Sequence, residues 1–389
     1  MRRRWWFAAA ALLLVAWSAL PLATARADTT FDSVTIENGY PKTLTFQASA
    51  HADSDITDAT LSYAITGRNT SAIGKPENIQ PGKRLDTSVV VQVNSSSSYI
   101  PVGSEFTYHW EVTLADGTKT SSPDQKFLFL PTGQDWKSVS GDFMTVYYHG
   151  DKQALASSYL QAGIETFDKM GTKLLQTKLA VVPVKVILFD NEQESAQARP
   201  PTSTKFDAAV TTCGTKVTQD IVLVIPVSCG TNDRTDTLRH EFTHIINATA
   251  GEGALGKLPS WLDEGTAVNG QTGPGDNYTS AFQTAVKGDR LLPFAQMGTA
   301  PSDATKVNLF YGQSYYMAKY LIDKGAGQYA QFFATIKKGA RFDDALKQTY
   351  GFDLAGFEAE FRSANGLKPT MYSEEMISGV VTIDDLIRR

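Results

Sequence analysis

The feature that most constrains this chain is a pair of histidines four positions apart, His240 and His244, with Glu241 directly after the first. Each residue of an α-helix is turned by about 100° from the one before, so positions four apart lie on one face, roughly one turn apart. Both imidazoles can then reach a single metal ion. The stretch 240–244 is therefore predicted to lie on a helix that supplies two metal ligands.

Two nitrogen ligands leave the site incomplete. A catalytic zinc ion usually takes three protein ligands and leaves a fourth position to water, and a carboxylate from a second helix can be the third ligand. Glu264 lies twenty residues after His244, in the stretch Pro259–Gly265 with the sequence PSWLDEG, and is placed to supply that carboxylate. Glu241 would lie beside the metal-bound water, where it can accept the proton of that water.

The same motif has a plainer interpretation. HExxH occurs by chance in many proteins, and two histidines four positions apart are often solvated or packed in a core. The chain contains only five histidines, however, and two of them fall in this motif. Together with the downstream Trp261-x-x-Glu264, this favours a metal site with His240, His244 and Glu264 as zinc ligands. The main alternative is a degenerate relative that does not catalyse.

This stretch resembles the gluzincin superfamily of metallopeptidases, and it is most similar to peptidase MA-like domains. The resemblance covers about residues 135–365. It implies one catalytic Zn²⁺, with His240 and His244 matching the zinc-binding histidines of the family, Glu241 its general base and Glu264 its third ligand. It also implies an α+β zincin-like metallopeptidase domain.

Tyr311 is a further candidate from the resemblance. The segment Tyr311-Gly312-Gln313-Ser314, at the head of an apolar helix, resembles the segment whose leading tyrosine stabilises the oxyanion in the aminopeptidase branch. The alternative is a core aromatic residue on an amphipathic helix.

The sequence departs from the branches of this superfamily at two points. The thermolysin branch has an acidic residue four positions after the ligand glutamate, which orients a zinc histidine, whereas this chain has Val268 there. The residue that orients the histidine is therefore unassigned. The aminopeptidase branch carries a Gly-x-Met-Glu-Asn motif that grips the amino terminus of the substrate, and this sequence has no such stretch. An endopeptidase is the favoured expectation.

Residues 1–27 are predicted to be a secretory signal peptide. Arginines at 2–4 form a basic segment, residues 5–20 form an apolar segment, and Ala25-Arg26-Ala27 provides a small-x-small cleavage signal. An uncleaved signal anchor is the rival interpretation, but Pro21 and the cleavage signal favour removal. No other segment is apolar enough to span a bilayer, so we expect an extracytoplasmic protein that is secreted, periplasmic or on the cell surface.

The charge of the chain excludes some partners. The full sequence has a net charge of −5, and the leader holds four arginines and no acidic residue, so the mature chain is more acidic still. It offers no basic patch for nucleic acid or anionic lipid.

The chain has two cysteines, Cys213 and Cys229. In an exported protein an even pair is most simply a disulfide, which would tie together the strands ahead of the active-site helix.

Residues 28–131 are predicted to be an all-β domain. Short strands and turn signals, with a Tyr108-His109-Trp110 strand, suggest an immunoglobulin-like sandwich, although the domain lacks an internal disulfide. The other histidines, His51, His109 and His149, are expected to be surface or packed residues. The expected strands are 43–48, 61–65, 89–93, 106–112 and 127–130, with a hairpin turn at 115–118.

The pattern changes after Pro131–Asp135, which we interpret as a linker. Beyond it strands alternate with amphipathic helices, and the zincin-like domain spans 135–365, followed by a polar tail at 366–389. The active-site helix is expected to start near Asn232-Asp233. Ala208–Thr212 is expected to be an edge strand that pairs with the substrate backbone, as in gluzincins.

The sequence thus predicts an exported zinc-dependent metallopeptidase that acts on a peptide or protein substrate through a zinc-bound water and the Glu241 base. Two other functions stay open. The chain could be a catalytically silent, peptidase-like binding protein whose β domain recognises a protein or cell-surface partner. It could also be a zinc hydrolase of a non-peptide substrate.

Overall fold

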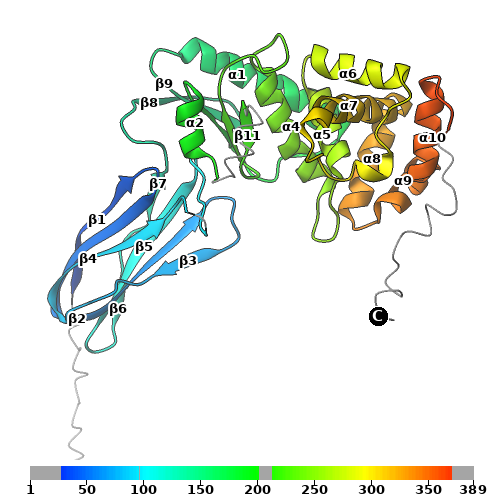
Figure 1. The fold of residues 1–389 in the computed structure, drawn as a ribbon. Coiled ribbons are helices and arrows are strands. Elements are labelled where there is room, and N and C mark those ends of the chain that lie inside the picture. Colours follow the sequence, from blue (N-terminus) through cyan, green and yellow to red (C-terminus); the bar gives the residue numbers. More distant parts are fainter. Residues whose placement is uncertain (1–27, 96, 201–212, 370–389) are drawn as a thin grey trace, which may run out of the picture.

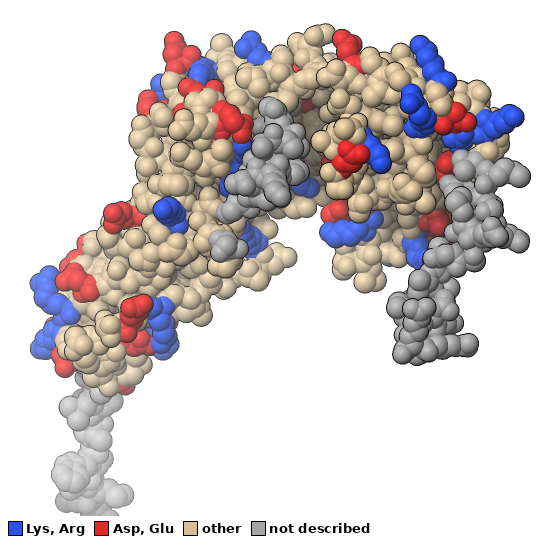
Figure 2. All heavy atoms as spheres, in the orientation of Figure 1, with Lys and Arg blue, Asp and Glu red and all other residues tan. Residues whose placement is uncertain are grey.

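The computed structural model describes residues 28–369 except for 96 and 201–212. A β-rich region comes first and is followed by a larger, mostly helical region built on a second sheet (Figure 1). The predicted leader, the proposed edge strand Ala208–Thr212 and nearly all of the predicted polar tail lie outside the described residues. On the face drawn in Figure 2, acidic and basic side chains are interspersed over both regions.

The β-rich region is a seven-stranded antiparallel sheet organised around one long strand, β2. The first half of β2 pairs with β1 and β4, and its second half pairs with β3 and β5. The strands are β1 (Thr29–Gly39), β2 (Thr43–Ile65), β3 (Ser71–Gly74), β4 (Gly82–Gln92), β5 (Glu105–Leu114), β6 (Lys119–Ser121) and β7 (Gln125–Leu128).

The separate strands predicted at 43–48 and 61–65 are therefore one strand, because no glycine or proline interrupts the pairing between them. β2 is nevertheless sharply bent. Phe46 and Tyr63 would lie about 56 Å apart in a straight strand at about 3.3 Å per residue, yet their rings stack with centroids 5.5 Å apart. The two halves of β2 thus face each other across a shared core. The immunoglobulin-like topology stays a prediction.

The second sheet has five strands in the order β11-β12-β10-β9-β8. The three inner strands are parallel, and the two edge strands run antiparallel to their neighbours. The inner strands are almost wholly buried, as expected for a parallel sheet that is covered on both faces. The strands are β8 (Trp136–Ser140), β9 (Met144–His149), β10 (Val184–Leu188), β11 (Gly214–Lys216) and β12 (Ile221–Val224).

Except for α2 (Glu192–Ala198), whose Ala198 lies in the core of the β-rich region, the helices pack against one face of this sheet and beyond its β11 edge (Figure 1). The others are α1 (Gln153–Thr166), which continues into a π-helical segment (Phe167–Leu174), α4 (Asp236–Gly251), α5 (Ser260–Gly270), α6 (Asp276–Lys287), α7 (Val307–Lys324), α8 (Ala326–Lys337), α9 (Phe342–Tyr350) and α10 (Leu354–Ala364). Across the described ranges, no helix has the length and apolar character needed to cross a membrane.

Helix α4, which carries His240 and His244, begins at Asp236, later than the predicted start near Asn232-Asp233. Asp233 Oδ1 accepts hydrogen bonds from the backbone N–H and the hydroxyl of Thr235. The side chain that was expected to cap the helix therefore closes a turn just ahead of it.

The other face of the second sheet is covered by the β-rich region. Val186 and Leu188 belong to the core under the helices, whereas their neighbour Ile187 belongs to the core of the β-rich region. Phe189, Ile221 and Leu223 join that second core. The two regions therefore share one continuous apolar core, and they are more than two bodies joined by the 131–135 segment.

One ion pair is buried beside this shared core. Lys185 Nζ lies 2.7 Å from Asp220 Oδ2, and both residues are almost completely buried. Strand alternation places Lys185 on the same sheet face as Ile187. A buried charge pair of this kind is costly to break, because the remaining partner would be left uncompensated.

Candidate metal centre and active site

Helices α4 and α5 lie side by side and bring the three predicted metal ligands together (Figure 1). The Nε2 atoms of His240 and His244 are 3.1 Å apart. Glu264 Oε2, from α5, lies 3.2 Å from Nε2 of His240 and 3.5 Å from Nε2 of His244. The two histidines face the same way because they are one helical turn apart, as the sequence predicts.

These separations fit a tetrahedral zinc site. Zinc binds imidazole nitrogen and carboxylate oxygen at about 2.0–2.1 Å, which places neighbouring ligand atoms of a tetrahedron about 3.3 Å apart. Glu264 Oε2 is buried and, apart from the contacts with His240 and His244, has no hydrogen-bond partner within the described part of the chain. Buried polar atoms are rarely left unsatisfied. The donor set of two imidazoles and one carboxylate, with this unsatisfied oxygen, is therefore a set that zinc fits.

Charges within the cluster favour ionised groups. Burial alone would raise the pKa of Glu264, but the adjacent His244 and His240 outweigh burial and hold that pKa well below its usual range. For His244, burial lowers the pKa, while Asp263 and Glu264 outweigh burial and raise it well above its usual range. The carboxylate ligand is therefore ionised at neutral pH, as metal binding requires.

Glu241 lies between α4 and the edge strand β11. Its Oε2 accepts a hydrogen bond of 2.8 Å from the backbone N–H of Lys216. Gly214 makes this approach possible, because a Cβ there would lie only 2.5 Å from Thr237 Cγ2 and 3.0 Å from Glu241 Cγ. In the described part of the chain β11 is the edge strand beside the centre, while the predicted edge strand at 208–212 lies outside the described residues.

Tyr311, in the first turns of α7, also lies beside the metal cluster. Its ring centroid is 6.3 Å from that of His240. Burial, and next to it the charge of Glu264, raises the pKa of the Tyr311 hydroxyl, so this group stays protonated and can donate a hydrogen bond. The structure thus places Tyr311 near the candidate centre, and its role in a reaction stays a prediction.

Asp263 is a residue of the centre that the sequence reasoning missed. Its Oδ2 lies 2.9 Å from His244 Nδ1, and its Oδ1 accepts a hydrogen bond of 2.8 Å from Asn247 Nδ2. It therefore takes the place of the histidine-orienting acid that was sought at Val268, which is fully buried in the core. The sequence signal for this residue was the aspartate directly before the ligand Glu264. Adjacent residues of a helix point about 100° apart, so Asp263 and Glu264 leave α5 in different directions.

The disulfide predicted between Cys213 and Cys229 is present. Cys213 directly precedes β11, whose glycine contacts α4. Cys229 directly precedes Gly230, whose carbonyl oxygen would lie 2.4 Å from a Cβ at Gly275, the residue before α6. The bridge therefore links the strand beside Glu241 to the loop that supports α6.

A second cluster of possible metal ligands, around His149, is less suited to a site. His149 lies 3.2 Å from a carboxylate oxygen of Glu194 and 3.4 Å from one of Asp190, but Lys152 already pairs with Asp190. His149 is buried, in keeping with the packed residue expected from the sequence. Lys152 therefore already balances the charge of one carboxylate in this cluster.

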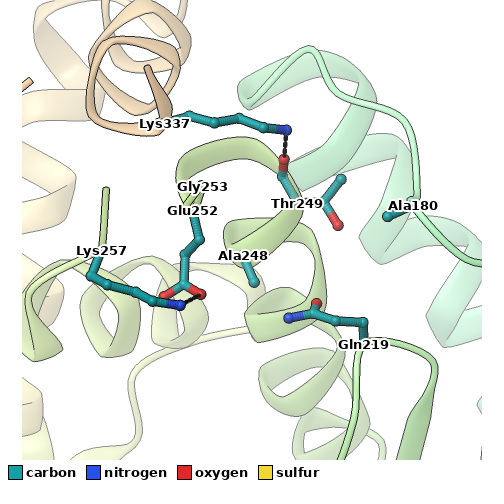
Figure 3. A pocket seen from close by; sticks show the side chains of 8 residues that line it. All are labelled: Ala180, Gln219, Ala248, Thr249, Glu252, Gly253, Lys257 and Lys337. Atoms are coloured by element: carbon teal, nitrogen blue, oxygen red, sulfur yellow. Dashed lines mark hydrogen bonds and ion pairs between the residues drawn. The ribbon is translucent and has the colours of Figure 1, made fainter. Parts of the chain in front are cut away.

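An open hollow of about 300 Å³ lies at the carboxyl end of α4 (Figure 3). Its charged groups are also partnered. Lys257 pairs with Glu252, and Lys337 donates a hydrogen bond to the carbonyl oxygen of Thr249. The candidate centre is therefore the cluster between α4 and α5.

The comparison with protein families supports the interpretation of this chain as a peptidase. Residues 175–365, nearly half of the chain, match a family model described as the Peptidase MA superfamily. The match contains the α4 and α5 residues of the centre and indicates a peptidase, which is a hydrolase. No curated protein matches the chain.

Similarity to solved structures is limited. Wild-type OgpA from Akkermansia muciniphila is 10% identical over 26% of this chain and 28% of its own, with a TM-score of 0.21. Catalytically inactive OgpA, in complex with an O-glycopeptide, is 13% identical over 28% of this chain and 31% of its own, also at 0.21. The chain thus spans less than a third of either protein, and this likeness carries no argument about its function.

Proposed function

We propose that this protein is an exported, zinc-dependent endopeptidase, with His240, His244 and Glu264 as ligands and Glu241 as general base. The observation that carries the proposal is the convergence of the three ligand atoms at 3.1–3.5 Å from one another. The family match over 175–365 supports peptide or protein as the substrate.

When bound there, zinc supplies a Lewis acid and a water whose pKa is lowered to about 7. Glu241 has one oxygen fixed by the N–H of Lys216, which orients the carboxylate. Its other oxygen accepts a proton from the attacking water and then passes the proton to the leaving amine. This carboxylate thus serves as base and then as acid.

Tyr311 would stabilise the charge that develops on the peptide carbonyl oxygen. Its hydroxyl stays protonated because burial and Glu264 raise its pKa. A single hydrogen-bond donor of this kind is typically worth about 3 kcal/mol of transition-state stabilisation.

The edge strand β11 offers a place for the substrate backbone. It pairs with β12 on one side only, within the described part of the sheet. An extended peptide can add to such an edge through main-chain hydrogen bonds. The role that the sequence prediction gave to 208–212 is therefore proposed for Gly214–Lys216.

Export is the proposed location. The leader-like sequence at 1–27 supports it, and so does the disulfide, because such bonds persist mainly in oxidising compartments.

A silent binding protein is the second candidate function. In that case the β-rich region would recognise a protein or cell-surface partner. Its cover of the peptidase-like sheet supports a structural part for the region in either case.

The test is hydrolysis of unfolded casein by the chain from Asp28. The proposal expects cleavage that a zinc chelator abolishes and added zinc restores. His244→Ala is expected to bind no zinc and to cleave nothing, with Lys319→Ala on the exposed face of α7 as the unaffected control. Cleavage that persists without zinc would overturn the proposal. If the protein binds zinc but hydrolyses only a non-peptide ester, the result would favour a zinc hydrolase of a non-peptide substrate.

A further inference from the structure

Tyr278, which the sequence reasoning did not select, lies face to face with Tyr311. The two ring centroids are 5.2 Å apart and the ring planes differ by 12°. Tyr278 is in the first turn of α6, and Tyr311 is near the start of α7. The Tyr311 ring therefore has Tyr278 as a stacked neighbour and also lies near His240, whose ring centroid is 6.3 Å away.

The backbone under Tyr278 is fixed against α7. A Cβ at Gly312, the residue after Tyr311, would lie only 2.3 Å from the carbonyl oxygen of Tyr278. The first turn of α6 and the turn of α7 that carries Tyr311 are thus in direct backbone contact. The Tyr278 backbone therefore cannot move away from α7 without separating the two helices.

The loop ahead of α6 is tied to the metal-ligand helix. Asp236, the first residue of α4, accepts hydrogen bonds from the backbone N–H of Thr272 at 2.8 Å and from its hydroxyl at 2.6 Å. Asp236 is almost fully buried. The loop that leads into α6 is therefore anchored to the helix that carries His240.

We propose that Tyr278 is a positioning residue, whose ring face holds Tyr311 so that the Tyr311 hydroxyl points to the carbonyl oxygen of a bound peptide. The inference rests on the proposed function and deepens it. Aromatic pairs prefer stacked or edge-to-face arrangements, so the stack restricts the rotation that would carry the Tyr311 hydroxyl away. Tyr278 needs only its ring for this role.

The hydroxyl of Tyr278 defines the competing possibility. Burial, and then the charge of Glu264, raises the pKa of Tyr278 to about 12, so this group is also a protonated donor near the cluster. If that hydroxyl touched the substrate, Tyr278 would be a catalytic residue. The variants Tyr278→Phe and Tyr278→Leu separate the two roles, because the first keeps the ring and loses the hydroxyl.

The kinetic test uses a quenched peptide built on a site that the wild type cleaves in casein. Tyr278→Phe is expected to keep kcat near the wild-type value. Tyr278→Leu is expected to lower kcat by about three- to tenfold, the range of a lost aromatic pair, with little change in KM. In a Tyr311→Phe background, Tyr278→Leu is expected to lower kcat no further.

Phe282→Leu is the matched control. Phe282 stacks on Tyr316 with ring centroids 4.1 Å apart, and this pair also joins α6 to α7. Its loss is expected to remove an aromatic pair between the same two helices without touching Tyr311, and to leave kcat unchanged. An equal fall of kcat in Phe282→Leu would show that Tyr278 acts only through the packing of α6 against α7. A fall in Tyr278→Phe, or an undiminished effect in the Tyr311→Phe background, would overturn the positioning role.

A second measurement needs neither zinc nor turnover. In the zinc-free chain labelled with ¹³C-tyrosine, the Tyr311 ring signals are those lost in Tyr311→Phe. They are expected to shift in Tyr278→Leu, which removes the ring current of the neighbour, and to shift much less in Tyr278→Phe. Unchanged signals in Tyr278→Leu would overturn the stack. If the wild type showed no hydrolysis, that result would count against the proposed function. The tyrosine signals would still test whether Tyr278 stacks on Tyr311.

Discussion

Asp263 connects the two helices of the candidate centre through its two carboxylate oxygens. One lies 2.9 Å from His244 Nδ1, and the other accepts a hydrogen bond from Asn247. A carboxylate on the outer nitrogen of a metal-binding histidine fixes the tautomer of the ring and raises the basicity of the inner nitrogen. Asp263 is thus proposed to prepare His244 for zinc, although it does not reach the metal position itself.

Replacing Asp263 by alanine is expected to weaken zinc binding by about 10- to 100-fold, the usual cost of losing such a partner. Competition with a zinc-chelating dye measures the change. Asp323→Ala is the control, because Asp323 pairs with Lys319 on the exposed face of α7. Equal zinc affinity in Asp263→Ala and the control would show that His244 needs no orienting partner.

At the scale of single residues, the sequence predicts the contacts that depend only on the spacing of residues along one helix. His240 and His244 are one helical turn apart on any α-helix, so their convergence could be predicted from a single segment. Asp263 and Tyr278 could not be predicted in this way. Their contacts depend on how α5 crosses α4 and how α6 meets α7, and these helices approach each other closely at Gly270 and Gly312.

The helices around the centre approach one another unusually closely at a glycine. A Cβ at Gly265, directly after Glu264 on α5, would lie 2.1 Å from the carbonyl oxygen of Ser314 on α7. This backbone contact sets the distance between the ligand helix and the helix that carries Tyr311. In the Glu264-Gly265 pair, the first residue is the proposed metal ligand and the second allows the close packing of α5 against α7.

Gly265→Ala is expected to force α7 away from α5 and to lower the free energy of unfolding by about 1–3 kcal/mol, as for other overpacked cores. Hydrolysis should fall as well, because Tyr311 moves with α7. Gly327→Ala in α8 is the control, since a Cβ there meets nothing within 4 Å. Alanine there should be neutral or should stabilise by up to about 1 kcal/mol.

Chemical unfolding of both variants measures the difference. A Gly265→Ala variant as stable as Gly327→Ala would contradict the close packing of α5 and α7.

Element positions were predicted better than element ends. The helix that carries His240 and His244 was located from the sequence, but α4 begins at Asp236 because Asp233 forms a turn instead of a cap. No helix is predicted from the sequence at 192–198, where the structure has α2. Its seven residues are too few to show a helical repeat.

The whole molecule is held together across its two regions. The core of the β-rich region buries Ile187, Ile221 and Leu223 of the second sheet and Phe189, which directly follows β10. Fully burying side chains of this size is worth about 1.5–3 kcal/mol each, so the four contribute about 6–12 kcal/mol. That is comparable with the total stability of an ordinary domain, about 5–15 kcal/mol. We infer that the β-rich region is a structural part of the peptidase unit.

A chain that begins at Gln134 is therefore expected to aggregate or to bind a hydrophobic dye, because it exposes this sheet face and the Lys185–Asp220 pair. Size-exclusion chromatography and dye binding, against the chain from Asp28, make the measurement. A monomeric truncated chain with the melting temperature and hydrolysis of the longer one would contradict the shared core. The sequence could not predict this contact, because each strand pattern shows only that a face is apolar and does not show what covers it.

The most direct test of the whole account compares the chain from Asp28 with its Glu241→Gln variant for zinc content and casein hydrolysis on the same preparations. Glutamine keeps the size of the side chain and the hydrogen bond to Lys216 but cannot accept the proton. The account predicts one zinc per chain in both proteins and hydrolysis in the wild type alone. Undiminished hydrolysis in Glu241→Gln, or a wild type without zinc, would contradict it.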